Sequence, residues 1–185
     1  MVYFWAMEMY FIALVAPEEI DQQIVKWKNF MKEKFGCMVA LRSPAHVTLI
    51  PPFWMKEEME NELIQSLNEF SAHQNQLMIQ LKNFSSFKPG VLFVDVIKNE
   101  QLALLKTDLE DFLLGQKKFP IKKEERSFHA HITIATRDLY KKAFFEAWDI
   151  FQNKKYEAEW RAKGVSVLRH NKKNWDVIHT SQLNS

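Results

Sequence analysis

Residues 46–53 read HVTLIPPF, and HITIA at residues 131–135 repeats their opening pattern. Each copy reads histidine, β-branched residue, threonine and aliphatic residue, and the copies lie nearly half of the 185-residue chain apart. Side chains alternate between the two faces of a strand, so each histidine shares a face with its threonine while the aliphatic residues face the other way. Each copy therefore predicts a strand with one polar and one apolar face.

Strands and helices in a repeated order surround the two copies. In the first half, apolar runs and helical periodicity predict strands at residues 11–15, 46–50, 77–84 and 91–97, and helices at 18–35 and 57–72. In the second half they predict helices at 102–113 and from an N-cap at Asp138 to Trp148, and strands at 131–136, 160–169 and 175–180. Pro51 and Pro52 are expected to end the strand that begins at His46.

This order predicts a single domain over residues 1–185, made of two pseudo-repeats at about 9–98 and 99–182. Residues 1–8 are predicted to be an N-terminal extension without a role in the core. If a pseudo-twofold axis relates the repeats, the two polar strand faces meet in one cleft that holds two imidazoles and two hydroxyls.

The composition excludes several other classes of protein. Hydrophobic residues make up 47% of the chain and aromatic residues 14%, enough for a core without metal or disulfide support. Cys37 is the one cysteine and cannot form an internal disulfide or a thiolate zinc cluster, and the 4 glycines form neither a P-loop nor a dinucleotide-binding motif. Residues 1–16 lack the basic start of a signal sequence and no apolar run has the length of a membrane span, so a soluble cytoplasmic protein is expected.

The net charge is weak and unevenly distributed. The formal charge is +2, and basic residues outnumber acidic ones in the second half of the chain, where lysines occur in pairs such as Lys122-Lys123. Such pairs are typical of a solvated surface, although they can attract phosphates where they cluster in space. This charge does not indicate binding of duplex DNA or of a membrane.

The four polar side chains of the repeated pattern suit phosphodiester chemistry. One group must take a proton from the attacking oxygen and another must give a proton to the leaving oxygen, and histidine does either near neutral pH. We therefore predict His46 and His131 as the acid and base, without fixing which is which. The hydroxyls of Thr48 and Thr133 are predicted to donate hydrogen bonds to the phosphate. This chemistry requires no metal ion or other cofactor.

A zinc site is the alternative chemistry for these histidines. His129 and His131 share one face of the second strand and would bind the ion together with His46. No carboxylate or thiolate partner is evident in the sequence, which disfavours this alternative. His73 and His170 are read as surface residues, and His179 is left undecided.

The paired motifs resemble those of the two-histidine (2H) phosphoesterase superfamily, which includes 2′-5′ RNA ligase-like proteins and cyclic phosphodiesterases. The resemblance covers about residues 9–180 and implies an α+β, bilobal fold of duplicated βαβ-type units, with two antiparallel sheets around a central cleft. It also implies metal-independent activity on cyclic phosphates or 2′-5′ linkages of an RNA end or small nucleotide, with His46 and His131 catalytic and Thr48 and Thr133 binding phosphate. A monomer is expected.

Arg137 and Phe53 lie close to the motifs in the sequence. Relatives often have a basic residue directly after the small residue of the second motif, whereas here Thr136 follows Ala135 and Arg137 comes one position later. On a regular strand this shift turns Arg137 to the other face. Phe53 is predicted to stack on a base, with a place in the core as the alternative. A nucleotide-binding or RNA-binding module that catalyses nothing is the alternative function.

Overall fold

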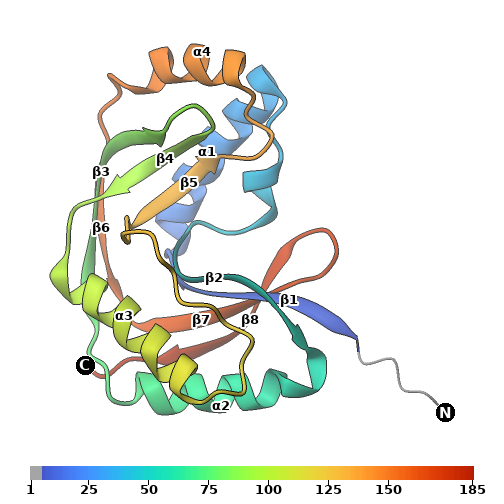
Figure 1. The fold of residues 1–185 in the computed structure, drawn as a ribbon. Coiled ribbons are helices and arrows are strands. Elements are labelled where there is room, and N and C mark those ends of the chain that lie inside the picture. Colours follow the sequence, from blue (N-terminus) through green and yellow to red (C-terminus); the bar gives the residue numbers. More distant parts are fainter. Residues whose placement is uncertain (1–5) are drawn as a thin grey trace.

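Two four-stranded sheets organise the structure, a computed structural model in which residues 6–185 are described (Figure 1). The first sheet has the strand order β2-β1-β7-β8 and the second the order β5-β4-β3-β6, and every pairing is antiparallel. The strands of the first sheet are β1 (Met7–Val15), β2 (His46–Lys56), β7 (Gly164–His170) and β8 (Trp175–Gln182). Those of the second are β3 (Leu77–Phe87), β4 (Val91–Val96), β5 (His131–Ala135) and β6 (Glu157–Ala162).

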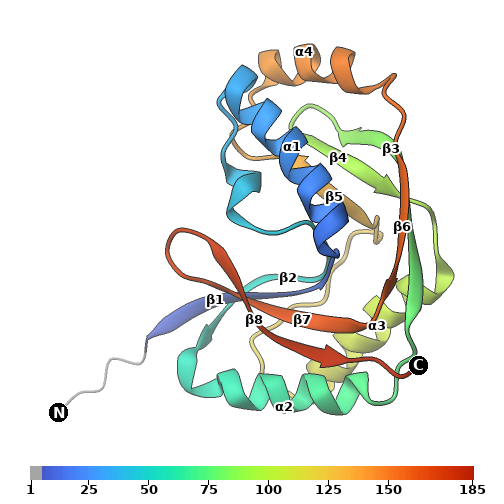
Figure 2. The same cartoon turned by 180° about the vertical axis from the view of Figure 1, so that it is seen from behind.

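Within residues 6–185, four α-helices flank the sheets (Figures 1 and 2). They are α1 (Glu18–Phe35), α2 (Glu60–Ser71), α3 (Glu100–Gly115) and α4 (Lys141–Phe151), with short 3₁₀ helices η1 (Val39–Arg42) and η2 (Glu57–Met59). Helices α2 and α3 pack against the first sheet, and α1 and α4 pack against the second. None of the helices within residues 6–185 is long and apolar enough to cross a membrane. The α+β fold with two antiparallel sheets is as predicted.

The two lobes do not coincide with the two predicted repeats. Each sheet takes two strands from the first repeat and two from the second, because the chain crosses between the sheets after β2 and again after β6. Helix α1 follows a strand of the first sheet but packs against β5 of the second. The two motif strands, β2 and β5, therefore lie in different sheets and contact each other across the molecule.

Strand β1 is central to the first sheet and is buried on both faces. Tyr10, Ile12 and Leu14 belong to the main core, whereas Phe11 and Ala13 face the opposite way and form a small cluster with Leu168. Met7 and Glu8 pair with Lys56 and Met55 of β2, so the prediction that residues 1–8 form an extension outside the fold was wrong for these two. Residues 1–5 lie outside the described part of the chain.

Strand β2 continues through Pro51 and Pro52 and ends at Lys56, so the prediction that the prolines end it was wrong. Two irregularities in the β1–β2 register occur in this stretch. The prolines are tolerated because β2 is at the edge of its sheet, where one side of the strand needs no ladder donors. Side chains keep the same alternation between the two strand faces before and after these irregularities. Val47 and Leu49 before the prolines and Phe53 and Met55 after them, all at odd-numbered positions, are buried.

Two further predictions were wrong. The strand predicted at residues 160–169 is two strands, β6 and β7, that belong to different sheets. At this crossover Gly164 packs so closely on β8 that a Cβ would lie 2.6 Å from a methyl carbon of Thr180. Asp138 is not the cap of α4, which begins at Lys141. Its carboxylate instead accepts the backbone N–H groups at the start of η1, from Met38 at 2.6 Å and Val39 at 2.9 Å.

Candidate active site

The two motif histidines are held by the same local hydrogen bond. Nδ1 of His46 lies 2.7 Å from the carbonyl oxygen of Pro44, and Nδ1 of His131 lies 2.6 Å from that of His129. In both cases the carbonyl belongs to the residue two positions earlier. Because a carbonyl only accepts, Nδ1 must carry the proton in each ring. Nε2 is therefore the nitrogen that each ring has available to accept or donate a proton.

A cavity of about 180 Å³ lies between the two sheets and brings the motifs together. His46 and Thr48 of β2 line it together with Thr133 of β5. His131 shares the strand face of Thr133, and its ring is close enough to His46 to lower the pKa of that ring. The cavity is smaller than the roughly 300–1,000 Å³ of pockets that enclose a whole ligand. It has room for a phosphate and the groups next to it.

Aromatic side chains form one wall of this cavity. The ring of Phe11 lies 4.7 Å from the ring of His46 and 4.6 Å from that of Trp175, measured between centroids. Phe11 and Trp175 both line the cavity, and sequence reasoning assigned neither of them to the site. Phe11 lies on the face of β1 opposite to the main core. Because the residues around it in β1 are also apolar, the sequence does not show which of them face the core.

Burial lowers the pKa of His46 to about 4. The hydrogen bond to the Pro44 carbonyl acts in the opposite direction, and the positive charges of Lys28 and of a protonated His131 contribute to the lowering. His46 is thus neutral at pH 7 in the free protein. A neutral imidazole with Nδ1 protonated has its Nε2 lone pair ready to accept a proton.

Lys28 is a buried lysine beneath the site, with 2% of its surface exposed. Its ammonium donates to the carbonyl of Ser43 at 2.9 Å, and burial lowers its pKa to about 8 although the Asp21 carboxylate opposes the change. Asp21 in turn accepts the backbone N–H of Ala45 at 2.5 Å. Helix α1 therefore holds the segment that leads into His46.

Sequence reasoning did not identify Lys28 as part of the site. The available signal was its position on the apolar stripe of α1, where Ile20, Ile24, Lys28 and Met31 are the buried residues. A lysine on such a stripe must bring its charge to a polar partner inside the protein.

His131 has a different electrostatic environment. Burial lowers its pKa, and the hydrogen bond to the His129 carbonyl opposes this change. The positive charge of a protonated His129 also lowers the pKa, whereas the negative charge of Asp95 raises it. The carboxylate of Asp95 lies 2.9 Å from Nε2 of His129. The rings of Phe93 and Phe87 lie 4.7 Å and 5.1 Å from the His131 ring, which is half-buried.

The zinc alternative needed His46, His129 and His131 around one ion. Between Ala6 and Ser185, no three side chains of histidine, cysteine, aspartate or glutamate are placed to hold a metal together. These three histidines are therefore not placed around one ion.

Phe53 and Arg137 are not where the sequence placed them. The Phe53 ring is 7% exposed and packs near Tyr10 in the main core, which corresponds to the core alternative and leaves little surface for stacking on a base. Arg137 lines the cavity, contrary to the expectation from strand alternation. Strand β5 has already ended at Ala135, and the positive φ of 32° at Arg137 redirects the chain.

His179, to which the sequence assigned no role, forms contacts within the fold. Nε2 of His179 lies 2.8 Å from Oδ1 of Asn68 and 3.1 Å from Oγ of Ser181. These contacts tie β8 to α2 and lie apart from the residues that line the cavity.

The comparisons with known proteins assign the family. Residues 16–174 match the model of the 2′-5′ RNA ligase superfamily. The chain therefore belongs to this superfamily, the two-histidine phosphoesterases that its motifs resemble. Among solved structures, E. coli LigT complexed with 3′-AMP has a TM-score of 0.72 at 16% identity, over 97% of this chain and 100% of LigT. TT0787 of Thermus thermophilus has a TM-score of 0.65 at 18% identity, over 96% and 98% of the two chains. These structures share its fold.

Curated relatives are more similar in sequence but match over a shorter length. A protein named as a phosphoesterase from Geobacillus sp. strain WCH70 is 30% identical over 121 residues, which are 64% of this chain and 65% of the relative. Another from Bacillus pumilus strain SAFR-032 is 30% identical over 97 residues, 51% of this chain and 53% of the relative. The match thus spans between half and two thirds of these relatives.

Proposed function

We propose that the protein is a metal-independent phosphoesterase that acts on cyclic phosphates or 2′-5′ phosphodiester linkages of RNA ends or small nucleotides. The observation that carries this proposal is the shared geometry of His46 and His131, which leaves Nε2 of each ring available. His46 lines the cavity, and His131 lies on the strand face of Thr133, which also lines it. Membership of the 2′-5′ RNA ligase superfamily supports the reaction class. LigT has been crystallised with 3′-AMP and with ATP, which supports a nucleotide as the ligand here.

The charges around the two rings suggest a division of labour. Burial and the charge of Lys28 lower the pKa of His46 to about 4, so His46 serves as the base. His131 has a nearby carboxylate, Asp95, that favours its protonated form against burial and the charge of His129, so His131 serves as the acid. In hydrolysis of a 2′,3′-cyclic phosphate, Nε2 of His46 takes a proton from water as the new O–P bond forms. The bond from phosphorus to one ribose oxygen breaks, and that oxygen receives the proton from Nε2 of His131.

The other polar residues of the cavity hold the phosphate. The hydroxyls of Thr48 and Thr133 approach from opposite sheets and donate to its non-bridging oxygens, where negative charge increases in the transition state. The guanidinium of Arg137 adds a positive charge at the rim. The aromatic wall of Phe11 and Trp175 keeps the reacting groups away from bulk water.

A panel of 2′,3′-cyclic nucleotides assayed in the presence of EDTA tests the proposal. Turnover that resists the chelator is the expected result. Tight binding of the same nucleotides without any turnover would contradict it and would support the non-catalytic binding module instead. Turnover that EDTA abolishes would contradict the metal-independent mechanism.

A further inference from the structure

A second groove lies beside the cavity, between the edge of β2 and the loop of residues 116–130 that joins α3 to β5. It has a volume of about 460 Å³, more than twice that of the cavity. Pro52, Trp54, Pro120, Lys122 and Lys123 are among the residues that line it. The reaction described above uses none of them except Pro52, which lines the cavity as well.

The groove continues the cavity along a single strand face. Because the alternation of β2 is preserved across its two irregularities, Trp54 is on the face of His46 and Thr48. Pro52 lies between them and borders both spaces. At about 3.3 Å per residue, the six positions from Thr48 to Trp54 span at most roughly 20 Å. A mononucleotide bound at the cavity does not reach that far, but a strand of several nucleotides does.

Trp54 is an aromatic side chain that the fold leaves uncovered. Trp54 belongs to the edge strand β2. Its residue surface is 54% exposed, whereas its neighbours Phe53 and Met55 are 7% and 1% exposed. An exposed indole beside basic residues is the typical platform on which a base of a single strand stacks, with little dependence on sequence.

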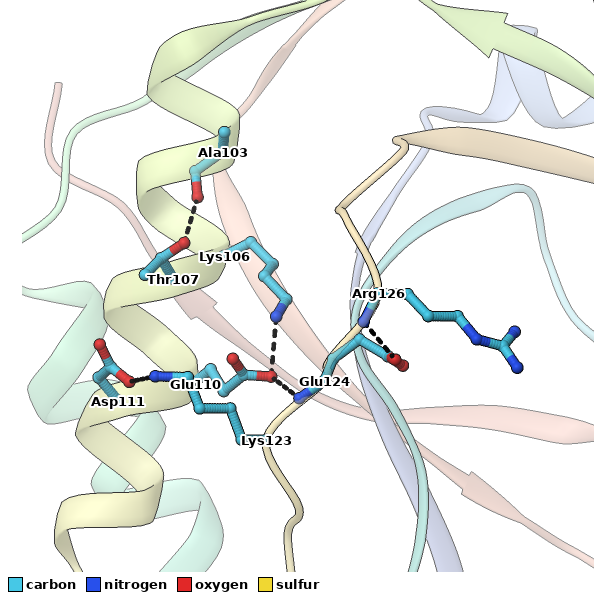
Figure 3. Close-up of polar contacts among 8 residues, drawn as sticks. All are labelled: Ala103, Lys106, Thr107, Glu110, Asp111, Lys123, Glu124 and Arg126. Carbon is cyan, nitrogen blue, oxygen red and sulfur yellow. Dashed lines mark hydrogen bonds and ion pairs between the residues drawn. The ribbon is translucent and has the colours of Figure 1, made fainter.

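The basic side of the groove is fixed in place by a buried ion pair. The Lys106 ammonium lies 2.8 Å from Oε1 of Glu110, with side chains only 8% and 3% exposed, and the same oxygen accepts the backbone N–H of Glu124 at 3.0 Å (Figure 3). Phe119 and Ile121 of the same loop are buried in the core. The backbone on both sides of Lys122 and Lys123 is therefore anchored.

The anchored loop presents positive charge to solvent. Lys123 forms one exposed pair with Asp111 at 3.2 Å, which contributes little in water. Lys122 and Arg126 are exposed, and within residues 6–185 neither pairs with an acidic side chain. The side chain of Arg126 extends from the loop away from α3 (Figure 3). Glu124 is the acidic residue that lines the groove.

We infer that this groove binds the single-stranded RNA that continues from the reacting phosphate, with one base stacked on Trp54 and a backbone phosphate near Lys122 and Lys123. The inference rests on the proposed function, and it makes an oligonucleotide with a terminal cyclic phosphate a better substrate than a cyclic mononucleotide. Cations with an aromatic platform match the charged backbone and the bases of a single strand, and the small cavity leaves all but the reacting end of such a substrate outside.

Comparison of two substrates tests this inference: a 2′,3′-cyclic mononucleotide, and an oligouridylate of about six nucleotides that ends in a 2′,3′-cyclic phosphate. The Trp54→Ala variant should raise KM for the oligonucleotide about tenfold, the effect of losing one stacked base, and leave the mononucleotide kinetics unchanged. Trp54→Phe should restore most of the difference. Phe145→Ala is the matched control, since Phe145 is a 47% exposed aromatic residue on α4, away from the groove.

A charge variant tests the other half of the groove. Lys122→Gln with Lys123→Gln should weaken oligonucleotide binding and reduce its salt dependence, whereas the same change in the exposed pair Lys141 and Lys142 of α4 should not. Equal effects of the groove variants on both substrates, or none on either, would overturn the inference.

A binding measurement separates this inference from the proposed function. Fluorescence anisotropy of a labelled oligouridylate with an unreactive 3′-hydroxyl reports on the groove without any turnover. If the wild type cleaves neither substrate but binds this oligonucleotide through Trp54, the proposed function fails and the groove stands. If the wild type cleaves both and Trp54→Ala binds the oligonucleotide as well as the wild type does, the groove fails and the function stands.

Discussion

His46 and His131 occupy the same place in two copies of one sequence pattern, and of the two only His131 has a nearby negative charge that favours its protonated form. Both rings hold their Nδ1 proton on a carbonyl two residues earlier, and burial lowers the pKa of both. The charge of Lys28 acts against a proton on His46, whereas that of Asp95 acts in favour of one on His131. The repeated motif thus positions two imidazoles in the same way, and residues outside the motif act differently on their pKa values.

Removal of either histidine is expected to have the largest effect. His46→Ala and His131→Ala should each lower kcat by about 10²–10⁴-fold with the fold intact, because a positioned acid or base contributes that much. Rates on a 2′,3′-cyclic nucleotide measure the effect, and circular dichroism checks the fold. Wild-type rates in either variant would refute the two-histidine mechanism.

A substrate with a p-nitrophenolate leaving group distinguishes the two roles. This group departs without a proton, so His131→Ala should lose far less activity on it than His46→Ala. The reverse order would exchange the assignment of base and acid.

Removal of either threonine hydroxyl should have the next largest effect. The two substitutions should have equal effects if both sheets bind the phosphate. Thr48→Val and Thr133→Val remove a hydroxyl that donates to a charged group, so each should weaken phosphate binding about tenfold or more. Competitive inhibition by inorganic phosphate measures this. Thr107→Val on the exposed face of α3 is the control, since its hydroxyl contacts only the Ala103 carbonyl in its own helix. Unchanged inhibition in both site variants would make the threonines strand residues without a role in binding.

Substitution of Lys28 should move one limb of the pH profile. With His46 as the base, kcat/KM rises as pH increases through the pKa of His46. Lys28→Met removes a positive charge that lowers this pKa, so the pKa should rise and the acidic limb should move to higher pH. Lys28→Arg keeps the charge and should leave the limb close to the wild-type position. An acidic limb that stays in place in Lys28→Met would show that the charge does not act on His46.

Substitution of Asp95 should move the other limb by a smaller amount, because the Asp95 side chain is 36% exposed and solvent screens it. With His131 as the acid, kcat/KM falls as pH rises through the pKa of His131. Asp95→Asn removes a negative charge that raises this pKa, so the basic limb should move to lower pH. Lys28→Met and Asp95→Asn should therefore both narrow the bell-shaped pH profile of kcat/KM, the first from the acidic side and the second from the basic side. Since the titrations of the two rings are coupled, the limbs are compared between variants and not read as single-residue values. Movement of the acidic limb in Asp95→Asn would contradict the assignment.

The strands and helices were predictable wherever a local pattern sufficed. The two motif strands, the helix predicted at residues 18–35 and the strands predicted at 77–84 and 91–97 follow from periodicity in the sequence. The errors occur where long-range pairing overrides a local signal. Pro51 and Pro52 remain in a strand because β2 lies at an edge, and Asp138 caps η1 because two segments a hundred residues apart meet there.

The local sequence specifies which groups can react. The motifs place two imidazoles and two hydroxyls on polar strand faces, since the alternation of a strand is a local property. The surroundings of these groups, including the aromatic wall of Phe11 and Trp175, arise from the three-dimensional fold. The fold also brought Lys28 beneath His46 and Asp95 near His131, and it placed Trp54 opposite the lysines of a distant loop. Electrostatic effects on a pKa depend on distance through space and on burial, and neither is encoded in the spacing of residues along the chain.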